Sequence, residues 1–320
     1  MTINSIKVKI LLFSLLFAIS NISGVFAIYD FSRDPTFSNI ISKKNEKMHM
    51  IEKLGIKFSK YTYKCDDEVL KKRYEDLSKE KWKVYFKNPE DINKPGVFGI
   101  YKDEFKVPDN WKTKFNSRIN FPCAFEYNLA HDTYNASLVF SERNCFLAIE
   151  APSSKNIKSF FELVDKYNIS HFIKLNPPDE YSEDYYPYWE DRKTESEDCL
   201  RFGKSNVNFF KYMWPHKKES DPQIICKLIN KISKSQDEGK IIAVSCRGGA
   251  GRTATFIAAY MLIEEVSKQI SEGVKKENID VSVDKVVWNV LVQRAFAIAY
   301  SSQYINLYRI LDEYISTLAS

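Results

Sequence analysis

Residues 240–257 read KIIAVSCRGGAGRTATFI, and this stretch decides the fold. Lys240 to Ser245 is rich in Ile and Val and predicts a buried strand, whereas Gly251 to Val266 predicts an apolar helix. Between them lies a short glycine-rich turn that begins at Cys246. A buried strand, a tight turn and a helix in this order are typical of an α/β layered domain.

The turn has the residue types that a nucleophilic phosphate site needs. Successive backbone N–H groups of a glycine-rich strand-to-helix turn can point at one anion, and the helix N-terminus adds partial positive charge. The same field favours the thiolate of a cysteine at the start of the turn. Arg252 can grip two phosphate oxygens, and Thr253 can donate a hydrogen bond that helps expel the cysteine sulfur. We therefore predict Cys246, Arg252 and Thr253 as catalytic residues, with the turn residues Arg247, Gly248, Gly249, Ala250 and Gly251 binding the substrate.

Strand-like and helix-like segments alternate from about residue 116 onward, which favours an α/β domain. Residues 28–111 are Lys-rich and polar and predict surface helices and loops packed on a core that the later residues supply. The acidic stretch from Glu180 to Asp198 predicts an exposed loop. Beyond the turn and its flanks, the patterns predict strands at 137–140, 145–149 and 170–175 and helices at 157–167, 224–232, 283–296 and 303–318.

Composition indicates a folded protein and excludes several classes of partner. Hydrophobic residues make up 44% and charged residues 28% of the 320 residues, which is not the composition of a disordered chain. The net charge of +5 is spread along the chain and gives no case for a nucleic-acid surface. The six cysteines show no C-x-x-C spacing, so we predict neither a metal site nor another cofactor.

The N-terminus predicts a secretory signal peptide over residues 1–27. Lys7 and Lys9 form a basic start, Ile10 to Ile19 is apolar, and Val25-Phe26-Ala27 fits a cleavage site with small residues. No later segment is apolar and long enough to cross a bilayer, so we expect a secreted protein without stable membrane insertion.

The turn and its surroundings resemble the classical protein tyrosine phosphatases, whose signature is HC-x5-R-[ST]. Residues 244–257, VSCRGGAGRTATFI, are similar to that family's VHCSAGVGRTGTFI. Other stretches are similar in the same order: 132–137 to DYINAS, 148–152 to ATQGP, 159–164 to DFWRMV, Tyr188-Trp189 to the YW of YWP, and Gln303-Tyr304 to a QY pair.

This resemblance implies one catalytic domain over residues 112–318, with a twisted mixed β-sheet flanked by helices. It implies hydrolysis of phosphate monoesters through a phosphocysteine on Cys246, with a phosphorylated protein as the substrate. Gln303 then joins the substrate-binding residues, and His216 joins the catalytic ones because Trp214-Pro215-His216 occupies the place of the family's WPD loop.

The sequence departs from the family's pattern at four positions. Ser245 replaces the histidine before the nucleophile, and His216 stands where the family has its aspartate general acid. Asp221 is a further carboxyl close to that loop, but it lies outside the register. Ile119 falls at the position of the tyrosine that clamps phosphotyrosine, and Ala299 at that of the glutamine that orients the hydrolytic water.

Three functions therefore stay open. The first is a tyrosine phosphatase in which His216 supplies the proton, and the second is a pseudophosphatase that binds phosphorylated ligands without efficient turnover. In the second reading, His216 is an ordinary surface residue. The third is a phosphatase for phosphoinositols, which Arg247 and the Lys-rich surface favour.

Overall fold

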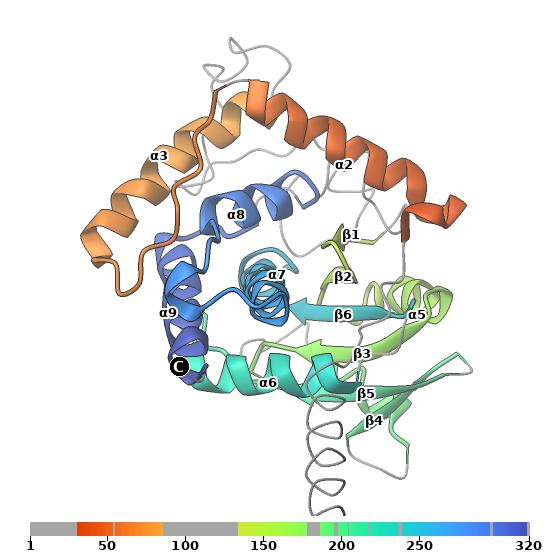
Figure 1. Cartoon of the computed structure of the whole chain (residues 1–320). Coiled ribbons are helices and arrows are strands. Elements are labelled where there is room, and N and C mark those ends of the chain that lie inside the picture. The colour runs from red at the N-terminus through yellow and green to blue at the C-terminus, as the bar shows by residue number, and fades with distance from the viewer. Residues whose placement is uncertain are drawn as a thin grey trace, which may run out of the picture.

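A six-stranded mixed sheet forms the centre of the molecule. The computed structural model describes residues 31–53, 55–85, 134–177, 186–194, 198–203, 205–216, 218–235, 239–294 and 297–318. The sheet order is β1-β2-β6-β3-β5-β4 (Figure 1). The four inner strands run parallel, and the two edge strands pair antiparallel with their neighbours. The predicted fold class is confirmed. The strands are β1 (Ala136–Phe140), β2 (Cys145–Glu150), β3 (Ile169–Lys174), β4 (Cys199–Phe202), β5 (Ser205–Lys211) and β6 (Ile241–Cys246).

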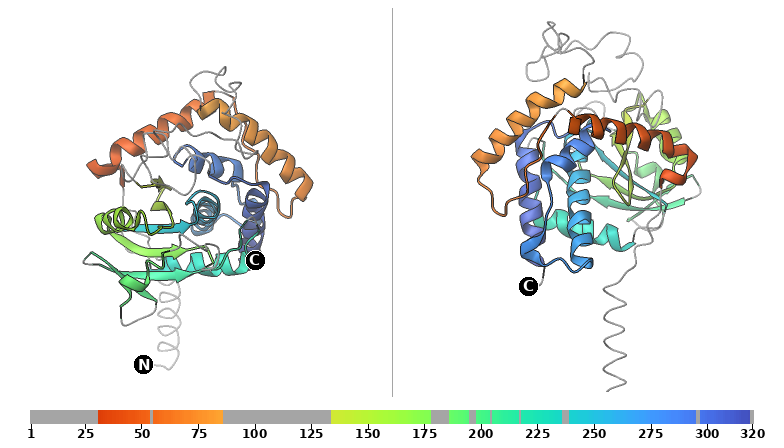
Figure 2. Two further views of the ribbon diagram at one scale, coloured as in Figure 1. Left: turned by 180° about the vertical axis from the view of Figure 1, so that it is seen from behind. Right: turned by 45° about the horizontal axis from the view of Figure 1, so that its top comes forward.

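Helices cover both faces of this sheet (Figures 1 and 2). All residues of β2 and β6 are buried, as expected for inner parallel strands with a layer on each side. One face carries α6 (Pro222–Ser235), α7 (Gly251–Ser271), α8 (Val283–Leu291) and α9 (Ser301–Thr317). The other face carries α5 (Ile157–Lys166), together with buried Tyr188 and Trp189. Within the described ranges, no helix has both the length and the apolar character that a membrane crossing requires.

Most predicted elements lie where the sequence places them, with three differences. The hairpin of β4 and β5 was not predicted. Helix α8 ends at Leu291 and not at Phe296. The predicted loop at 180–198 is described only in part, and there it contains the short 3₁₀ helix η4 (Glu190–Arg192). The predicted signal peptide lies outside the described residues.

An N-terminal arm, defined here as the described residues between 31 and 85, packs on both clusters of the core. Phe31 and Phe37 join the cluster that contains α5, and the later part of the arm joins the cluster that contains α7. It begins with the 3₁₀ helix η1 (Phe31–Arg33) and contains α2 (Pro35–Lys53) and α3 (Asp67–Tyr85). Helix α2 crosses α8, and α3 lies against α9 (Figure 1). Leu70, Tyr74 and Leu77 of α3 belong to the same hydrophobic cluster as α7, α8 and α9. The arm is therefore part of the folded core.

Two buried carboxylates fasten the arm to the C-terminal helices. The backbone N–H of Ser59 donates to Asp284 Oδ2 over 2.9 Å, and the Tyr304 hydroxyl donates to the other oxygen of Asp284. Asp312 accepts from the Tyr61 hydroxyl and, over 3.0 Å, from the backbone N–H of Lys64. A buried carboxylate without such donors would be strongly destabilising, so these bonds fix the position of the arm.

Candidate active site

The phosphate loop, residues 246–253, joins β6 to α7 at the carboxyl edge of the parallel strands. Cys246 is the last residue of β6 and is 3% exposed, and Gly251 is the first residue of α7. Ala250 precedes the helix and offers no side-chain hydrogen bond to its first N–H groups. These groups are thus available to an anion, at the edge where α/β sheets bind their ligands.

Added side chains would clash at two positions of this loop, with fixed backbone at Gly249 and with a movable side chain at Gly251. Gly249 has φ +64°, and a Cβ there would lie 2.5 Å from the carbonyl carbon of Ile149 and 2.6 Å from the nitrogen of Glu150. A Cβ on Gly251 would lie 2.6 Å from Gln303 Nε2. The loop therefore passes directly over the end of β2 and beneath the side chain of Gln303.

A buried arginine, Arg294, holds the loop from behind. Its Nε donates to the Gly249 carbonyl over 3.0 Å, and its Nη2 donates to the Gly248 carbonyl over 3.2 Å. Nη2 also donates to Asn135 Oδ1 over 2.6 Å, and Nη1 donates to Ser137 Oγ over 3.0 Å. Because Arg294 binds the loop carbonyls on one side, the N–H groups are free to face the other side, where the anion would sit.

Neither Arg294 nor its partner Asn135 was predicted as a site residue from the sequence. The sequence feature that could have indicated Arg294 is its position inside the apolar stretch 290–299, VLVQRAFAIA. A charged residue in a buried stretch needs a polar partner. Asn135 links Arg294 to a further buried acid, because its Nδ2 donates to Glu150 Oε2 over 2.8 Å. Glu150 is paired with Cys246 across β2 and β6.

Ser245 is fully buried and has a hydroxyl partner. Its Oγ lies 3.1 Å from the hydroxyl of Tyr188, which is also fully buried. The backbone carbonyl of Ser245 accepts from Leu175 N over 2.8 Å. The position before the nucleophile is thus fixed by neutral groups, without the ring that the family's histidine would supply.

Arg252 connects the phosphate loop to the loop that carries His216. It is 3% exposed, and its Nη1 donates to the carbonyl of Trp214 over 2.7 Å. Trp214 is buried, and its backbone N–H donates to the Leu175 carbonyl over 3.1 Å. The two loops therefore meet at the predicted phosphate-gripping arginine.

The hydroxyl of Thr253 is buried and has no hydrogen-bond partner among the described residues. The predicted bond from Thr253 to the Cys246 sulfur is therefore not formed in this state. A bond that forms only on the phosphocysteine is consistent with the role predicted for Thr253, which stays a prediction.

His216 is exposed beside the start of α9. Its ring lies 6.5 Å from the ring of Tyr300, edge to face at 80°. Asp221, the other acid considered, accepts from the backbone N–H groups of Gln223 over 2.9 Å and Ile224 over 3.3 Å. Asp221 therefore caps α6, which leaves His216 as the titratable group of this loop that is closest to the family's acid position.

Gln303, which the resemblance predicts to bind substrate, lies against the phosphate loop. It is 4% exposed, and its Oε1 accepts from the backbone N–H of Ala299 over 2.8 Å and of Tyr300 over 3.4 Å. Its Nε2 faces Gly251. Ala299 has no polar side chain, so Gln303 is the amide that this segment presents to the loop.

Two other described cysteines are poor nucleophiles. Burial raises the pKa of the Cys145 thiol well above its ordinary value. Burial, with a smaller effect from Glu313, raises the pKa of Cys226 to about 12. Both remain protonated thiols near neutral pH, and all five described cysteines are free.

Of the other residues singled out in the sequence, Arg247 lies in the described part of the chain and Ile119 does not. Arg247 is exposed at the rim of the loop. Ile119, predicted at the position of the phosphotyrosine clamp, lies outside the described residues. Among the residues that the structure describes, no group of three or more His, Cys, Asp or Glu could hold a metal ion.

Comparison with known proteins agrees with the fold and with the family resemblance. The family model for protein-tyrosine phosphatase matches residues 116–218 and 204–313. Tyrosine-protein phosphatase 69D of Drosophila melanogaster is 26% identical over 218 residues, which are 56% of this chain and only 14% of that longer protein. A solved structure reported as "Structural basis of PTPN18 fingerprint on distinct HER2 tyrosine phosphorylation sites" superposes with a TM-score of 0.57 at 17% identity. That superposition covers 78% of this chain and 96% of the other, and at this identity it concerns the fold.

Proposed function

Because the chain belongs to the protein-tyrosine phosphatase family, we propose that it hydrolyses phosphotyrosine in proteins through a phosphocysteine on Cys246. The observation that carries this proposal is the phosphate loop itself. Cys246 begins a loop whose carbonyls are held from behind by Arg294 and whose predicted phosphate ligand, Arg252, is buried beside it.

In the first step, the Cys246 thiolate attacks phosphorus and the bond from phosphorus to the tyrosine oxygen breaks. The departing phenolate takes a proton from the imidazolium of His216. Histidine is the side chain that most often transfers protons in catalysis near neutral pH. The loop N–H groups and Arg252 stabilise the charge on the three phosphoryl oxygens.

In the second step, water attacks the phosphocysteine, the bond from sulfur to phosphorus breaks and inorganic phosphate leaves. His216, now neutral, can accept the proton of that water. Thr253 donates to the departing sulfur, and Gln303 supplies the amide for the attacking water because Ala299 cannot contribute one.

A specific observation favours the pseudophosphatase as the second candidate. Ala299 has no side-chain amide to orient the attacking water, and His216, which would protonate the leaving group, is exposed. Assistance to both steps is therefore weaker than in the family's pattern. Binding of the phosphate group depends on the phosphate loop, whose residues are all present. Such a protein would hold a phosphorylated ligand and turn it over slowly.

The test compares two substrates on the full chain. We expect turnover of an aryl phosphate with an acidic phenol and much weaker turnover of phosphotyrosine peptides, with Cys246→Ser abolishing both. The tyrosine phenol, with a pKa of ~10, needs a proton to leave, and loss of a positioned acid reduces the rate ~10²–10⁴-fold. His216→Ala should therefore slow the peptide far more than the activated ester.

Three outcomes separate the candidates. Equal effects of His216→Ala on the two substrates would remove His216 from the mechanism. Phosphopeptide binding that Arg252→Ala weakens, without any Cys246-dependent turnover, would overturn the enzyme and leave the pseudophosphatase. A clear preference for soluble phosphoinositols over phosphotyrosine peptides would instead support the third function.

We also propose that the protein is secreted after removal of residues 1–27, on the sequence pattern alone. N-terminal sequencing of exported protein should find a start after Ala27. A start at Met1 would reject the cleavage.

A further inference from the structure

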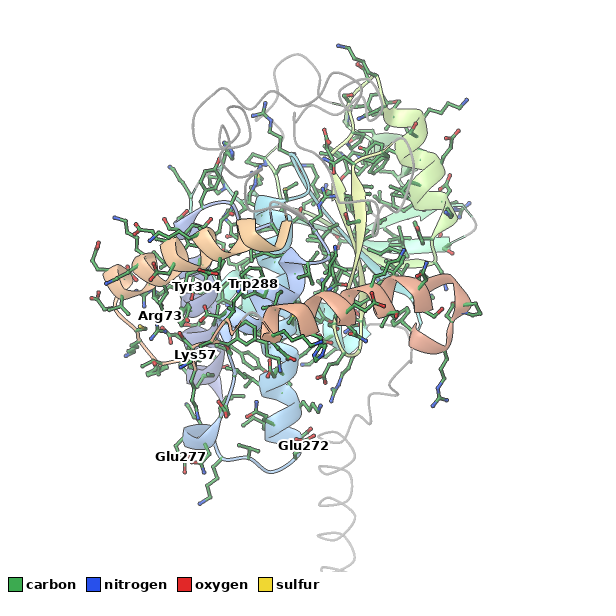
Figure 3. The ribbon with its side chains drawn as sticks, turned by 90° about the horizontal axis from the view of Figure 1, so that it is seen from above. Lys57, Arg73, Glu272, Glu277, Trp288 and Tyr304 are labelled. Atoms are coloured by element: carbon green, nitrogen blue, oxygen red, sulfur yellow. The ribbon has the colours of Figure 1, made fainter. Side chains whose placement is uncertain are left out.

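The N-terminal arm reaches the corner of the chain that precedes α9. The hydroxyl of Tyr74, in α3, donates to the backbone carbonyl of Ile298 over 2.9 Å. Tyr74 is 5% exposed and Ile298 is 1% exposed, so the bond is shielded from water. The ring of Tyr74 also packs on the ring of Tyr304, 5.7 Å away. Figure 3 shows Tyr304 close to α3, far from Glu272 and Glu277 at the other end of the helical layer.

This corner has an unfavourable backbone conformation. Ile298 has φ +51°, which is rare for a β-branched residue and typically destabilises the chain unless neighbouring contacts hold it. The bond from Tyr74 is such a contact, because it fixes the direction of the Ile298 carbonyl. Without it, the peptide between Ile298 and Ala299 could rotate toward a more favourable conformation.

The same corner sets the position of two groups near the phosphate loop. The next two N–H groups, those of Ala299 and Tyr300, both donate to Gln303 Oε1. These bonds orient the Gln303 amide so that its Nε2 faces Gly251. The ring of Tyr300 lies against that of His216. A rotation at Ile298 would therefore change where both the amide and the histidine lie relative to Cys246.

We propose that Tyr74 is a positioning residue for hydrolysis of the phosphocysteine. It acts through the Ile298 carbonyl on Gln303 and Tyr300, and it touches neither substrate nor reacting atoms. This inference rests on the proposed function and adds that the N-terminal arm supplies part of the catalytic unit. With an activated aryl phosphate, formation of the phosphocysteine needs no proton from His216 and depends on the loop and Arg252, which Tyr74 does not contact. The effect on this substrate should therefore fall on the second step.

Tyr74→Phe removes only the hydroxyl and keeps the ring on Tyr304. Tyr61→Phe is a matched control, because it removes another arm hydroxyl that bonds to α9, at Asp312, well beyond the corner. Rapid mixing with an activated aryl phosphate measures the initial burst of phenolate and the steady-state rate separately. Thermal unfolding and sulfate binding report on the fold and the loop.

We expect Tyr74→Phe to lower kcat about tenfold, since small misplacements of positioned groups have large effects on rate. The burst rate and kcat/KM should stay unchanged, and KM should fall with kcat because phosphocysteine accumulates. Tyr61→Phe should keep wild-type values of all these quantities, and sulfate binding should be the same in both variants.

Each other result counts against the inference. If the wild type shows Cys246-dependent turnover and the Tyr74→Phe and Tyr61→Phe variants have the same kcat, the positioning role is overturned. The proposed function is then unaffected. An equal fall of kcat and kcat/KM, with a lower unfolding temperature, would make Tyr74 a structural residue only. Absence of Cys246-dependent turnover in the wild type would reject the proposed function and this inference together.

Discussion

Replacing Gly249 by alanine tests whether the shape of the phosphate loop is required for turnover. Two effects act at this position. An alanine at φ +64° is less stable by about 1–2 kcal/mol, because the left-handed conformation brings its Cβ close to the next carbonyl oxygen. In addition, the new Cβ would lie 2.5 Å from the carbonyl carbon of Ile149, in the backbone of an inner strand that cannot move aside.

The loop must therefore shift, and the shift is what should reduce activity. A displacement of about 1 Å at positioned groups lowers rates by about 10²-fold, or about 2.7 kcal/mol of transition-state stabilisation. We expect Gly249→Ala to lower kcat/KM toward an activated aryl phosphate by that factor, while the protein stays folded.

Gly273→Ala is the matched control, because Gly273 has φ +83° and nothing within 4 Å of an added Cβ. It carries the same conformational penalty without a clash, at the other end of α7 from the phosphate loop. We expect an unfolding temperature about 2–8 °C lower and wild-type kcat/KM. Wild-type kcat/KM in Gly249→Ala, or an equal loss of activity in both variants, would refute the reasoning.

Two further predictions concern buried groups. In Arg294→Lys the positive charge remains, but the lysine cannot reach all four acceptors of the guanidinium. We expect a free energy of unfolding in urea about 3 kcal/mol lower and kcat/KM about 10²-fold lower. Wild-type values of both would contradict the role of Arg294 behind the loop. Burial raises the pKa of Glu264 to about 7, so the folded protein keeps a proton that the unfolded chain releases above its ordinary value of 4.5. Stability should therefore fall as the pH rises from about 4.5 to 7, and Glu264→Gln should remove this part of the slope when unfolding is compared at pH 5 and pH 8. An unchanged difference between the two pH values would show that another group is responsible.

The local parts of the site were predictable from the sequence, whereas the groups that support it were not. The loop from Cys246 to Thr253 lies in a single stretch, so its strand, turn and helix are visible in the order of residues. Arg294 lies in the bend after α8 and binds Asn135, which is 159 positions away, and no periodicity indicates such a pair. Tyr74 is still farther in sequence, 224 positions, from the Ile298 carbonyl that it holds.

The missed hairpin is a different case, because its pattern was present. Leu200 and Phe202 alternate with exposed or half-exposed neighbours, as do Val207 and Phe209, and this is the period of two that indicates a strand with one buried face. Gly203, with φ +57°, marks the turn between them. The lengths of α2 and α3 were less predictable, because the apolar face of each helix is narrow. These helices gain most of their stability from packing on α8 and α9.

The seating of the N-terminal arm has a consequence for the order in which the chain can fold during synthesis. The arm leaves the ribosome well before the acids that receive it, because Asp284 and Asp312 are made more than 200 residues later. Until α8 and α9 have emerged, Ser59, Tyr61 and Lys64 lack these partners, and closing so long a loop is slow. A segment that is translated early is therefore among the last to dock, and a nascent chain that stops before α9 exposes the apolar face of α3 to chaperones and proteases.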